Sequence, residues 1–458
     1  MRTQMVHQFA IADRTVGGRS EVGSNLGEVA IVGAGIGGLT LALELERRGV
    51  ACRVFEATAS IGATGVGINL LPHASKELAA LGVLSELEAV AVATDQAVFF
   101  NRFGQHVYSE PLGRFAGYDH PQLSIHRGDL QAVLLRAVEE RLVPVRTGTR
   151  CSRVRPVPGA VAMQLELADG STEEVTAAVA VGCDGVHSTL RRQLHPGEGP
   201  PKYSGYNMWR GVTRWEPILS GAGMIRAGWL TRGKLVIYPI RHDPDGDGRQ
   251  LVNWVAEIAG PIRAERDWNR AGSVEDFIAA FADWHFDWLD VPAFLRGTDL
   301  VLEYPMVDQD PLSFWGRGRI TLLGDAAHPM VPRGSNGAGQ AILDARHLAD
   351  ELAARGTTPE ALRSYEKQRI AATARVVLAN RTMPPDAILG EVYERTGDRP
   401  FARIEDVISH EELAAITERY KEIAGYSRRL LEAEGGGSPR DGTAISTRPS
   451  GGRTEQMG

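Results

Sequence analysis

The chain has 458 residues, of which 43% are hydrophobic and 23% charged, as expected of a soluble globular protein large enough for two or three domains. Its formal net charge of -7 and pI near 6.0 provide no basic field, which argues against nucleic acid or anionic membrane as a partner. The three cysteines, Cys52, Cys151 and Cys183, are too few and too scattered for a disulfide framework or a zinc site, so we expect a cytoplasmic protein with reduced thiols and no metal.

Both ends of the chain lack the apolar content needed to fold. Residues 1–28 contain no apolar run long enough for a signal peptide or a membrane span. Residues 433–458 are rich in Gly, Ser, Pro and Thr. We therefore expect a disordered lead and a disordered tail, with the function carried between them.

The first folded segment, EVAIVGAGIGGLTLALELERRGVACRVFEA, predicts a strand, a glycine turn, a helix and a second strand. Gly33 permits a tight turn, Gly35 lets a pyrophosphate approach the backbone, and Gly38 lets the helix pack closely. The helix N-terminus then offers free N–H groups and a positive dipole end to the phosphates. Glu56 ends the second strand, where an acid binds the ribose hydroxyls of an adenosine. The unit therefore predicts dinucleotide binding.

The middle of the chain is predicted to be a mostly antiparallel sheet. The β-rich runs at 233–240 and 251–258 are separated by the turn sequence HDPDGDG. We expect the substrate to lie between this sheet and the cofactor. Tyr206, Trp209, Arg210 and Tyr238 are the candidate wall residues, although aromatic residues on sheets are more often part of a core.

Two further apolar strands end in acids at the positions where α/β folds bind ligands. The first ends at Asp184 and Gly185, and the second at Gly324 and Asp325. Either acid alone could equally be a helix cap or a turn former. After Gly337 the pattern becomes helical through the end of the folded region.

These three motifs, in this order, resemble the FAD-dependent aromatic hydroxylases, the class A family of p-hydroxybenzoate and salicylate hydroxylases, over about residues 29–380. The resemblance implies an α/β protein, α+β overall, with a Rossmann-like FAD-binding domain, an interleaved antiparallel substrate domain and C-terminal helices. It implies non-covalent FAD, with NADH or NADPH and O2 as co-substrates. The cofactor-binding residues would be Gly33, Gly35, Ile36, Gly37, Gly38, Glu56, Gly65, Val66, Gly67, Arg127, Asp184, Gly185, Asp325, Gly334, Asn336, Gly337 and Ala338.

The resemblance also assigns roles within that set. Asp325 would bind the ribitol of FAD, and Asp184 would support both FAD and the nicotinamide nucleotide. Arg127 would contact the flavin nucleotide. Residues 65–67 would line the isoalloxazine, unless they are simply a turn that crosses a sheet. Only one G-x-G-x-x-G stands at a strand-to-helix junction, so the nicotinamide nucleotide would bind transiently.

The segments GVGINLLPHA, SIHRGDLQ, MWRGVT, LVNWV, YPMVDQDPL and WGRGRITLLGDAAH are similar to the subfamily of 5-methylphenazine-1-carboxylate monooxygenases of secondary metabolism. One departure from the family pattern is Arg333, where an apolar or small residue usually stands. A guanidinium there could bind a carboxylate in a bidentate pair, or it could point into solvent. We predict an aromatic, phenazine- or salicylate-like acid as substrate, with oxygen insertion that could release CO2. The catalytic candidates are Pro332, Arg333, Arg210 and Tyr206, and the substrate contacts are Tyr206, Trp209, Tyr238 and Pro332.

The predicted domain division has five parts. It comprises a lead (1–28), a discontinuous FAD-binding domain (29–96, 124–200 and 301–372), a substrate domain (97–123 and 201–300), C-terminal helices (373–432) and a tail (433–458). We expect a monomer or a homodimer.

Two alternatives share the fold. One is another FAD oxidoreductase, such as an epoxidase or an isoprenoid reductase, which would use the same FAD motifs. The other is a flavin-free binding protein similar to the GDP-dissociation inhibitors. The intact glycine motif, Glu56 and the Gly324–Asp325 pair argue against the second.

Overall fold

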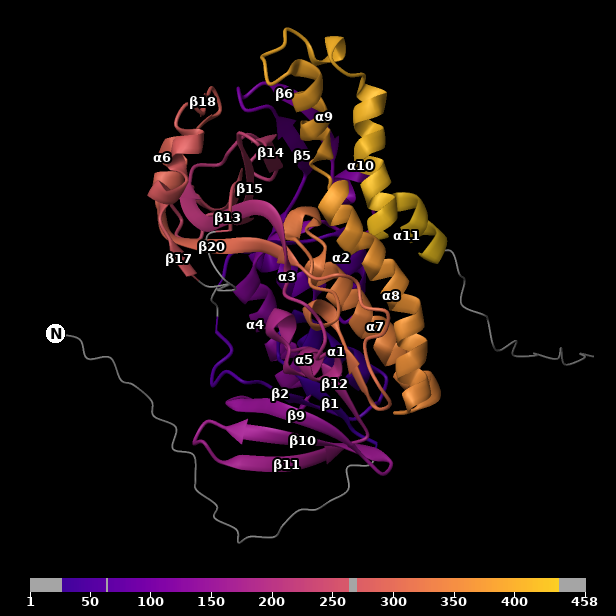
Figure 1. Cartoon of the computed structure of the whole chain (residues 1–458). Coiled ribbons are helices and arrows are strands. Elements are labelled where there is room, and N and C mark those ends of the chain that lie inside the picture. The colour runs from indigo at the N-terminus through magenta and orange to yellow at the C-terminus, as the bar shows by residue number, and fades with distance from the viewer. Residues whose placement is uncertain (1–26, 63–64, 263–269, 436–458) are drawn as a thin grey trace, which may run out of the picture.

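The computed structural model describes residues 27–62, 65–262 and 270–435. It confirms the mixed α/β class, with a helix-covered parallel sheet, a large mostly antiparallel sheet and a group of C-terminal helices (Figure 1). The expected lead and most of the expected tail lie outside the described residues. The first residues of that tail, 433–435, are instead the end of helix α11 (Arg428–Gly435).

The parallel sheet contains five strands in the order β21-β12-β1-β2-β8, all parallel to their neighbours. Its central strands are short runs of apolar residues buried on both faces, as a parallel sheet requires. Helices α1, α4 and α7 pack around it to form the largest core. The strands and helices are β1 (Val29–Val32), β2 (Cys52–Phe55), β8 (Val145–Arg146), β12 (Val179–Gly182), β21 (Ile320–Leu322), α1 (Ile36–Arg47), α4 (Arg127–Glu140), α5 (Thr189–Leu194) and α7 (Gly337–Arg355).

A small antiparallel sheet lies at one end of the molecule, beside the parallel sheet (Figure 1). It is a meander of three consecutive strands joined by short turns. The strands are β9 (Thr149–Val157), β10 (Ala160–Leu167) and β11 (Thr172–Ala177). The sequence had not predicted this sheet as a separate element.

The large sheet contains eight strands in the order β17-β20-β13-β16-β15-β14-β5-β6. All adjacent pairs are antiparallel except β14 and β5, which are parallel. The strands are β5 (Gln96–Phe100), β6 (His106–Pro111), β13 (Lys202–Trp215), β14 (Met224–Trp229), β15 (Gly233–Arg241), β16 (Gln250–Ala259), β17 (Arg270–Gly272) and β20 (Thr298–Asp308). The two segments predicted for the substrate domain therefore meet in one sheet, but the boundary predicted after residue 300 falls inside β20.

Helix α6 (Val291–Arg296) and a hairpin of β18 (His285–Phe286) and β19 (Leu289–Asp290) cover one face of this sheet with an aromatic core. A short sheet of β3 (Gly67–Leu70), β7 (Leu123–His126) and β4 (Val92–Ala93) connects the two halves, with α2 (Pro72–Ala80) and α3 (Leu84–Val90) beside it.

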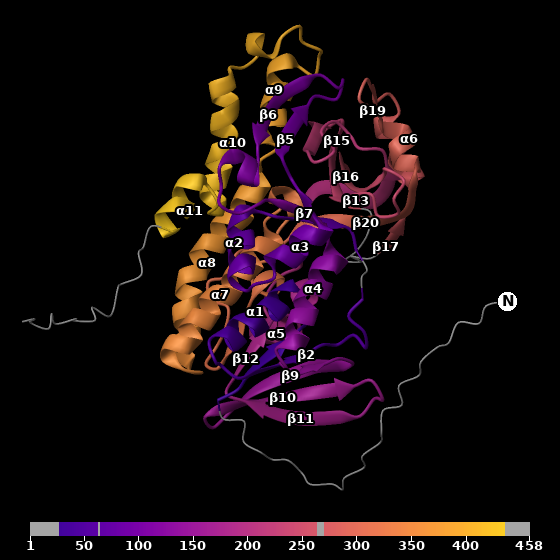
Figure 2. The same ribbon diagram turned by 180° about the vertical axis from the view of Figure 1, so that it is seen from behind.

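The C-terminal helices lie along one side of the molecule and contact both halves (Figures 1 and 2). They are α8 (Pro359–Thr382), α9 (Ala387–Thr396), α10 (His410–Ala424) and α11. Helix α8 runs without interruption across the boundary predicted after residue 372. Within the described ranges, every helix is too short or too polar to cross a lipid bilayer.

Candidate active site

The turn between β1 and α1 is shaped by its glycines. Gly33 has a φ of +107°, and a Cβ there would lie 2.4 Å from the carbonyl oxygen of Cys183. A Cβ at Gly38 would lie 2.0 Å from the carbonyl oxygen of Gly33, so the helix packs directly on the turn. At Gly35, by contrast, no atom lies within 4 Å of the Cβ position. The first and third glycines meet protein backbone, whereas the second borders open space.

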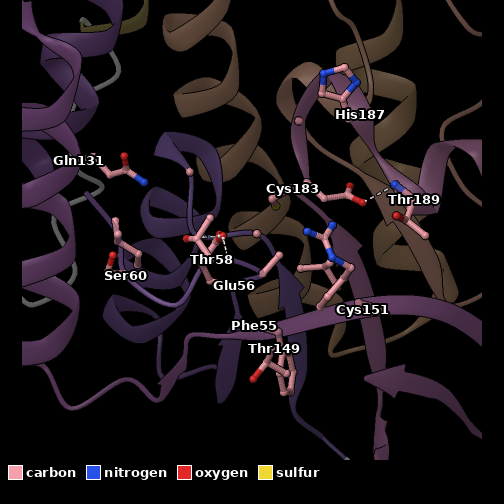
Figure 3. A pocket seen from close by; sticks show the side chains of 18 of the residues that line it. Phe55, Glu56, Thr58, Ser60, Gln131, Thr149, Cys151, Cys183, His187 and Thr189 are labelled. Atoms are coloured by element: carbon pink, nitrogen blue, oxygen red, sulfur yellow. Dashed lines mark hydrogen bonds between the residues drawn. The ribbon is translucent and has the colours of Figure 1, made fainter. Parts of the chain in front are cut away.

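That space belongs to a cavity of about 390 Å³ at the carboxyl ends of β1, β2 and β12 (Figure 3). Glu56, Arg127, Asp184 and Gly185 line it together with the glycine turn, so the structure brings these predicted residues together. Further residues, not singled out from the sequence, also line it: Phe55, Thr58, Ser60, Gln131, Thr149, Cys151, Cys183, His187 and Thr189. The ends of parallel strands are where α/β proteins bind ligands.

The carboxylate of Glu56 is held at the edge of this cavity. Its Oε2 accepts a hydrogen bond from the backbone N–H of Ala34 (2.8 Å), and its Oε1 accepts one from the N–H of Thr58 (2.8 Å). Gln131 donates to the carbonyl of Ala34 (2.9 Å). Gln131 lies one helical turn after Arg127 on α4, and this four-residue spacing is the sequence signal that could have identified it.

The two carboxylate oxygens of Asp184 have different surroundings. Its Oδ2 accepts hydrogen bonds from the N–H groups of Thr189 (2.7 Å) and Leu190 (3.3 Å), at the start of α5. Its buried Oδ1 has no hydrogen-bond partner among the described residues. Burial raises the pKa of this carboxyl, although these bonds partly oppose the shift. The helix-cap interpretation and the ligand interpretation therefore apply to different oxygens of one side chain.

Asp325 lies between the cavity and the start of α7. Its side chain is solvent-exposed, yet much of the surrounding volume is protein, and this desolvation raises the pKa of the carboxyl against the opposing charges of His328 and Arg127. Its Oδ1 lies 3.8 Å from the position of a Cβ on Gly337, the first residue of α7. Asp325 therefore lies beside a helix N-terminus, where a negative charge is favoured.

The segment 65–67 is fastened to the large sheet. The carbonyl of Gly67 accepts hydrogen bonds from Arg210 (2.6 Å) and from the hydroxyl of Tyr238 (2.9 Å). Its N–H donates to Oδ1 of Asn253 (2.7 Å), a contact that the sequence did not reveal. Val66 is buried and Gly65 is exposed. Arg210 and Tyr238 thus contact the backbone of the segment that was expected to border the flavin.

Strand alternation divides the predicted wall residues between two faces. Tyr206 and Arg210 share the face of β13 that is turned toward residues 65–67. Trp209 is on the opposite face, 2% exposed, with its ring stacked 5.0 Å from that of Phe277. This corrects the expectation that Trp209 contacts substrate, because its side chain belongs to the aromatic core.

Arg333 lies in the short turn Pro332–Gly334, above Tyr206. It is buried, its Nε donates to Oε2 of Glu257 (3.2 Å), and its guanidinium carbon lies 4.5 Å from the ring centroid of Tyr206. Its buried Nη2 has no hydrogen-bond partner among the described residues. The side chain is therefore directed into the protein, rather than into solvent.

A buried ion cluster surrounds that arginine. Lys234 contacts Oε1 of Glu257 (2.8 Å) and also pairs with Asp386. Burial opposes ionisation of Asp386, but the attraction of Lys234 and Arg226 prevails and lowers its pKa. Among the described residues, three cations surround two carboxylates here: Arg226, Lys234 and Arg333 against Glu257 and Asp386. The cluster therefore has an excess of positive charge.

The rest of the predicted turn lies at the start of α7. Pro332 is exposed, Gly334 and Asn336 are buried, and Gly337 and Ala338 are half-buried in the first turn of the helix.

The structure thus brings together a cavity at the strand ends, a helix N-terminus and a cationic sheet face. Open space over Gly35, the fixed Glu56 and the unpartnered oxygen of Asp184 fit the adenosine and pyrophosphate of FAD.

Comparison with known proteins agrees with this geometry. The family described as "FAD binding domain" matches residues 27–208 and 260–380. Phenazine 1,6-dicarboxylic acid hydroxylase PhzS of Lysobacter antibioticus is 41% identical over 87% of this chain and 98% of its own length. 3-Amino-4-hydroxybenzoate 2-monooxygenase PtnB3 of Streptomyces platensis is 36% identical over 75% of this chain and 84% of its own length. HpxO of Klebsiella pneumoniae with FAD and uric acid has a TM-score of 0.69 at 23% identity, over 88% of this chain and 96% of that chain, a likeness of fold.

Proposed function

The chain belongs to the FAD binding domain family and is an FAD-dependent aromatic monooxygenase, and we propose that its substrate is an aromatic or heteroaromatic carboxylic acid. Both relatives named above carry an aromatic acid in their names, one a phenazine dicarboxylate and the other a benzoate. The reaction would use one NAD(P)H and one O2, with one oxygen atom entering the ring and the other leaving as water.

The observation that carries this proposal is the Arg333 guanidinium. Glu257 and Tyr206 fix its orientation, while Nη2 has no hydrogen-bond partner among the described residues. Leaving a buried charged donor unpaired is unfavourable, and a carboxylate is the natural partner for a guanidinium nitrogen. A buried Nε of Arg210 is unpaired in the same way on the same sheet face. An anionic substrate would satisfy both donors.

The cofactor contacts are proposed as follows. The glycine turn and the N-terminus of α1 receive the pyrophosphate, Glu56 the adenosine ribose and Asp325 the ribitol. Arg127, Asp184 and Gly185 line the same path. Residues 65–67 and 334–338 would border the flavin. The N-terminus of α7 would then lie against the flavin ring and favour negative charge on it.

When bound, FAD accepts the reducing equivalents of NAD(P)H and activates O2, and the protein supplies binding, orientation and electrostatics. Arg333 and Arg210 would hold the acid, and Tyr206 would support its ring. Pro332, exposed at the start of the turn, would border the reacting carbon. If oxygen enters at the carboxylate-bearing carbon, the ring carbon–carboxyl bond breaks, CO2 leaves, and two protons are consumed for each NAD(P)H and O2.

The test is stopped-flow measurement of flavin reduction with a panel of phenazine, benzoate, pyridine and quinoline carboxylates and their uncharged amides. We expect at least one acid to accelerate reduction and to yield a hydroxylated product, whereas the matching amide does neither. Equal stimulation by acids and amides would reject the proposal. Mass spectrometry of the product then shows whether the carboxyl group is retained or lost.

A further inference from the structure

The turn that precedes α7 is held by the C-terminal helices. Ser335 has a φ of +54°, a left-handed conformation that residues other than glycine rarely adopt. Such a conformation persists only where its surroundings hold it. The contacts that hold it therefore bear directly on the shape of the proposed flavin site.

The principal contact comes from Tyr420 on α10, which is 1% exposed. Its hydroxyl donates to Oδ1 of Asn380 (2.7 Å) and accepts from Nδ2 of Asn336 (3.1 Å). The same oxygen lies 1.5 Å from the position that a Cβ on Gly334 would occupy. Gly334 therefore needs to be glycine because Tyr420 presses against it.

Both sides of the turn are tied to the same helices. Nδ2 of Asn380, on α8, donates to the carbonyl of Val331 (3.1 Å), just before the turn. Nε2 of Gln340, in the first turn of α7, donates to the carbonyl of Ala424 on α10 (3.2 Å). Burial raises the pKa of the Tyr420 hydroxyl well above its usual value, so it remains protonated and able to donate. The network thus spans the turn from Val331 to the first residues of α7.

We propose that Tyr420 is a positioning residue for the cofactor: its hydroxyl holds the backbone of residues 334–337 in the shape that receives the flavin. The inference rests on the proposed placement of the flavin against this turn. A helix N-terminus stabilises negative charge only when its N–H groups are held in place. Reduced, anionic flavin therefore depends on the fixed turn more than neutral, oxidised flavin does.

The first test is Tyr420→Phe, which keeps the ring and removes only the hydroxyl. We expect the Kd of the apoprotein for FAD, measured by flavin fluorescence, to rise roughly fivefold to tenfold. The reduction potential of the bound flavin, measured against a reference dye, should fall as well. The matched control is Tyr203→Phe, which removes a hydroxyl that donates to the Gly260 carbonyl (2.8 Å) in the substrate sheet. That variant should leave both quantities unchanged.

A second variant, Asn336→Ala, removes the donor on the turn itself and leaves the bond from Tyr420 to Asn380. It should shift Kd and potential in the same direction, and it decides the question if Tyr420→Phe does not fold. Lower thermal stability in Tyr420→Phe, with unchanged Kd and potential, would overturn the proposal and leave Tyr420 a packing residue. If the wild-type protein binds FAD but oxidises no aromatic acid, the proposed substrate is rejected. The proposal for Tyr420 would still be decided by the Kd and the potential of its variants.

Discussion

The cavity around the glycine turn and the sheet face around Arg333 differ in what holds their residues in place. In the cavity, most of these contacts are made by backbone atoms. Glycine is required at Gly33 and Gly38 because a Cβ there would clash with a carbonyl oxygen, and backbone amides hold the carboxylate of Glu56. At the sheet face, side chains distant in sequence hold one another. Arg333 pairs with Glu257, 76 residues away, and Lys234 pairs with Asp386, 152 residues away.

The two regions therefore depend on the amino-acid sequence in different ways. A cavity built from backbone is determined by short sequence motifs and suits the invariant part of the chemistry, the adenosine diphosphate of the cofactor. A face built from paired side chains can change its charge by a single substitution without altering the fold. We therefore expect changes in the cavity to affect FAD binding and changes at the sheet face to affect the choice of substrate.

The largest expected effect is that of Gly35→Val. No protein atom lies within 4 Å of the new Cβ position, so the variant should fold while its side chain fills space needed by the pyrophosphate. We expect FAD affinity to fall by about 100-fold or more. Flavin titration of the apoprotein measures this, and circular dichroism checks the fold. Gly197→Val, which also meets no atom within 4 Å but lies outside the cavity, is the control. Unchanged FAD affinity in Gly35→Val would refute the assignment of the cavity.

Arg333→Met tests the other half. Loss of a charge-assisted bond of about 2 to 3 kcal/mol should raise the Kd of the acid roughly 30-fold to 150-fold. The uncharged amide should bind as before, and Arg333→Lys should recover only part of the loss. Glu257 retains Lys234 as a partner, so the variant is expected to fold and keep FAD. Calorimetry with the acid and the amide measures the difference, and equal losses for both ligands would remove Arg333 as the anchor.

Asp325→Ala and Asp184→Ala compare two acids within the cofactor half. Asp325 accepts no hydrogen bond from a described residue, whereas one oxygen of Asp184 is already bound by the amides of Thr189 and Leu190. Asp325→Ala should therefore weaken FAD binding about tenfold more than Asp184→Ala. Asp184→Ala should instead lower the melting temperature of the apoprotein, because two N–H groups at the start of α5 lose their acceptor. Equal FAD affinities would reject the ribitol assignment.

The sequence predicted the cofactor half well because its signals are local. The strand, glycine turn and helix of residues 29–56 fold as one unit, and Asp184 and Asp325 follow strands that a simple apolar pattern reveals. Gln131 was missed because it belongs to no motif, and the only local signal for it is its four-residue spacing from Arg127 on α4.

The substrate half could be predicted only in outline. The residues around Trp209 in β13 do not show which face of the strand meets the aromatic core. In the fold, Trp209 lies on the core face, opposite the face that carries Tyr206 and Arg210. The pairing of Arg333 with Glu257 and the contact of Tyr420 with Asn336 depend on the tertiary fold. No local pattern reports such contacts, so the turn was expected while its supports were not.

The smallest expected effect concerns the stability of the apoprotein, and it distinguishes a residue kept for the cofactor from one kept for the fold. Because burial raises the pKa of Asp325, its charged form is disfavoured in the folded state. The folded protein is therefore destabilised by this carboxylate at pH values above the raised pKa, and the destabilisation disappears as the pH falls through that pKa and the group becomes protonated. Asp325→Asn removes the charge, so the apoprotein should melt slightly higher near neutral pH. The gain should be only on the order of 1 °C, because the side chain is solvent-exposed and its charge is therefore screened. The gain should shrink as the pH is lowered, while FAD affinity is reduced throughout. A melting temperature that instead falls in Asp325→Asn near neutral pH would mean that the charge stabilises the turn beside α7, and that Asp325 serves the fold as well as the cofactor.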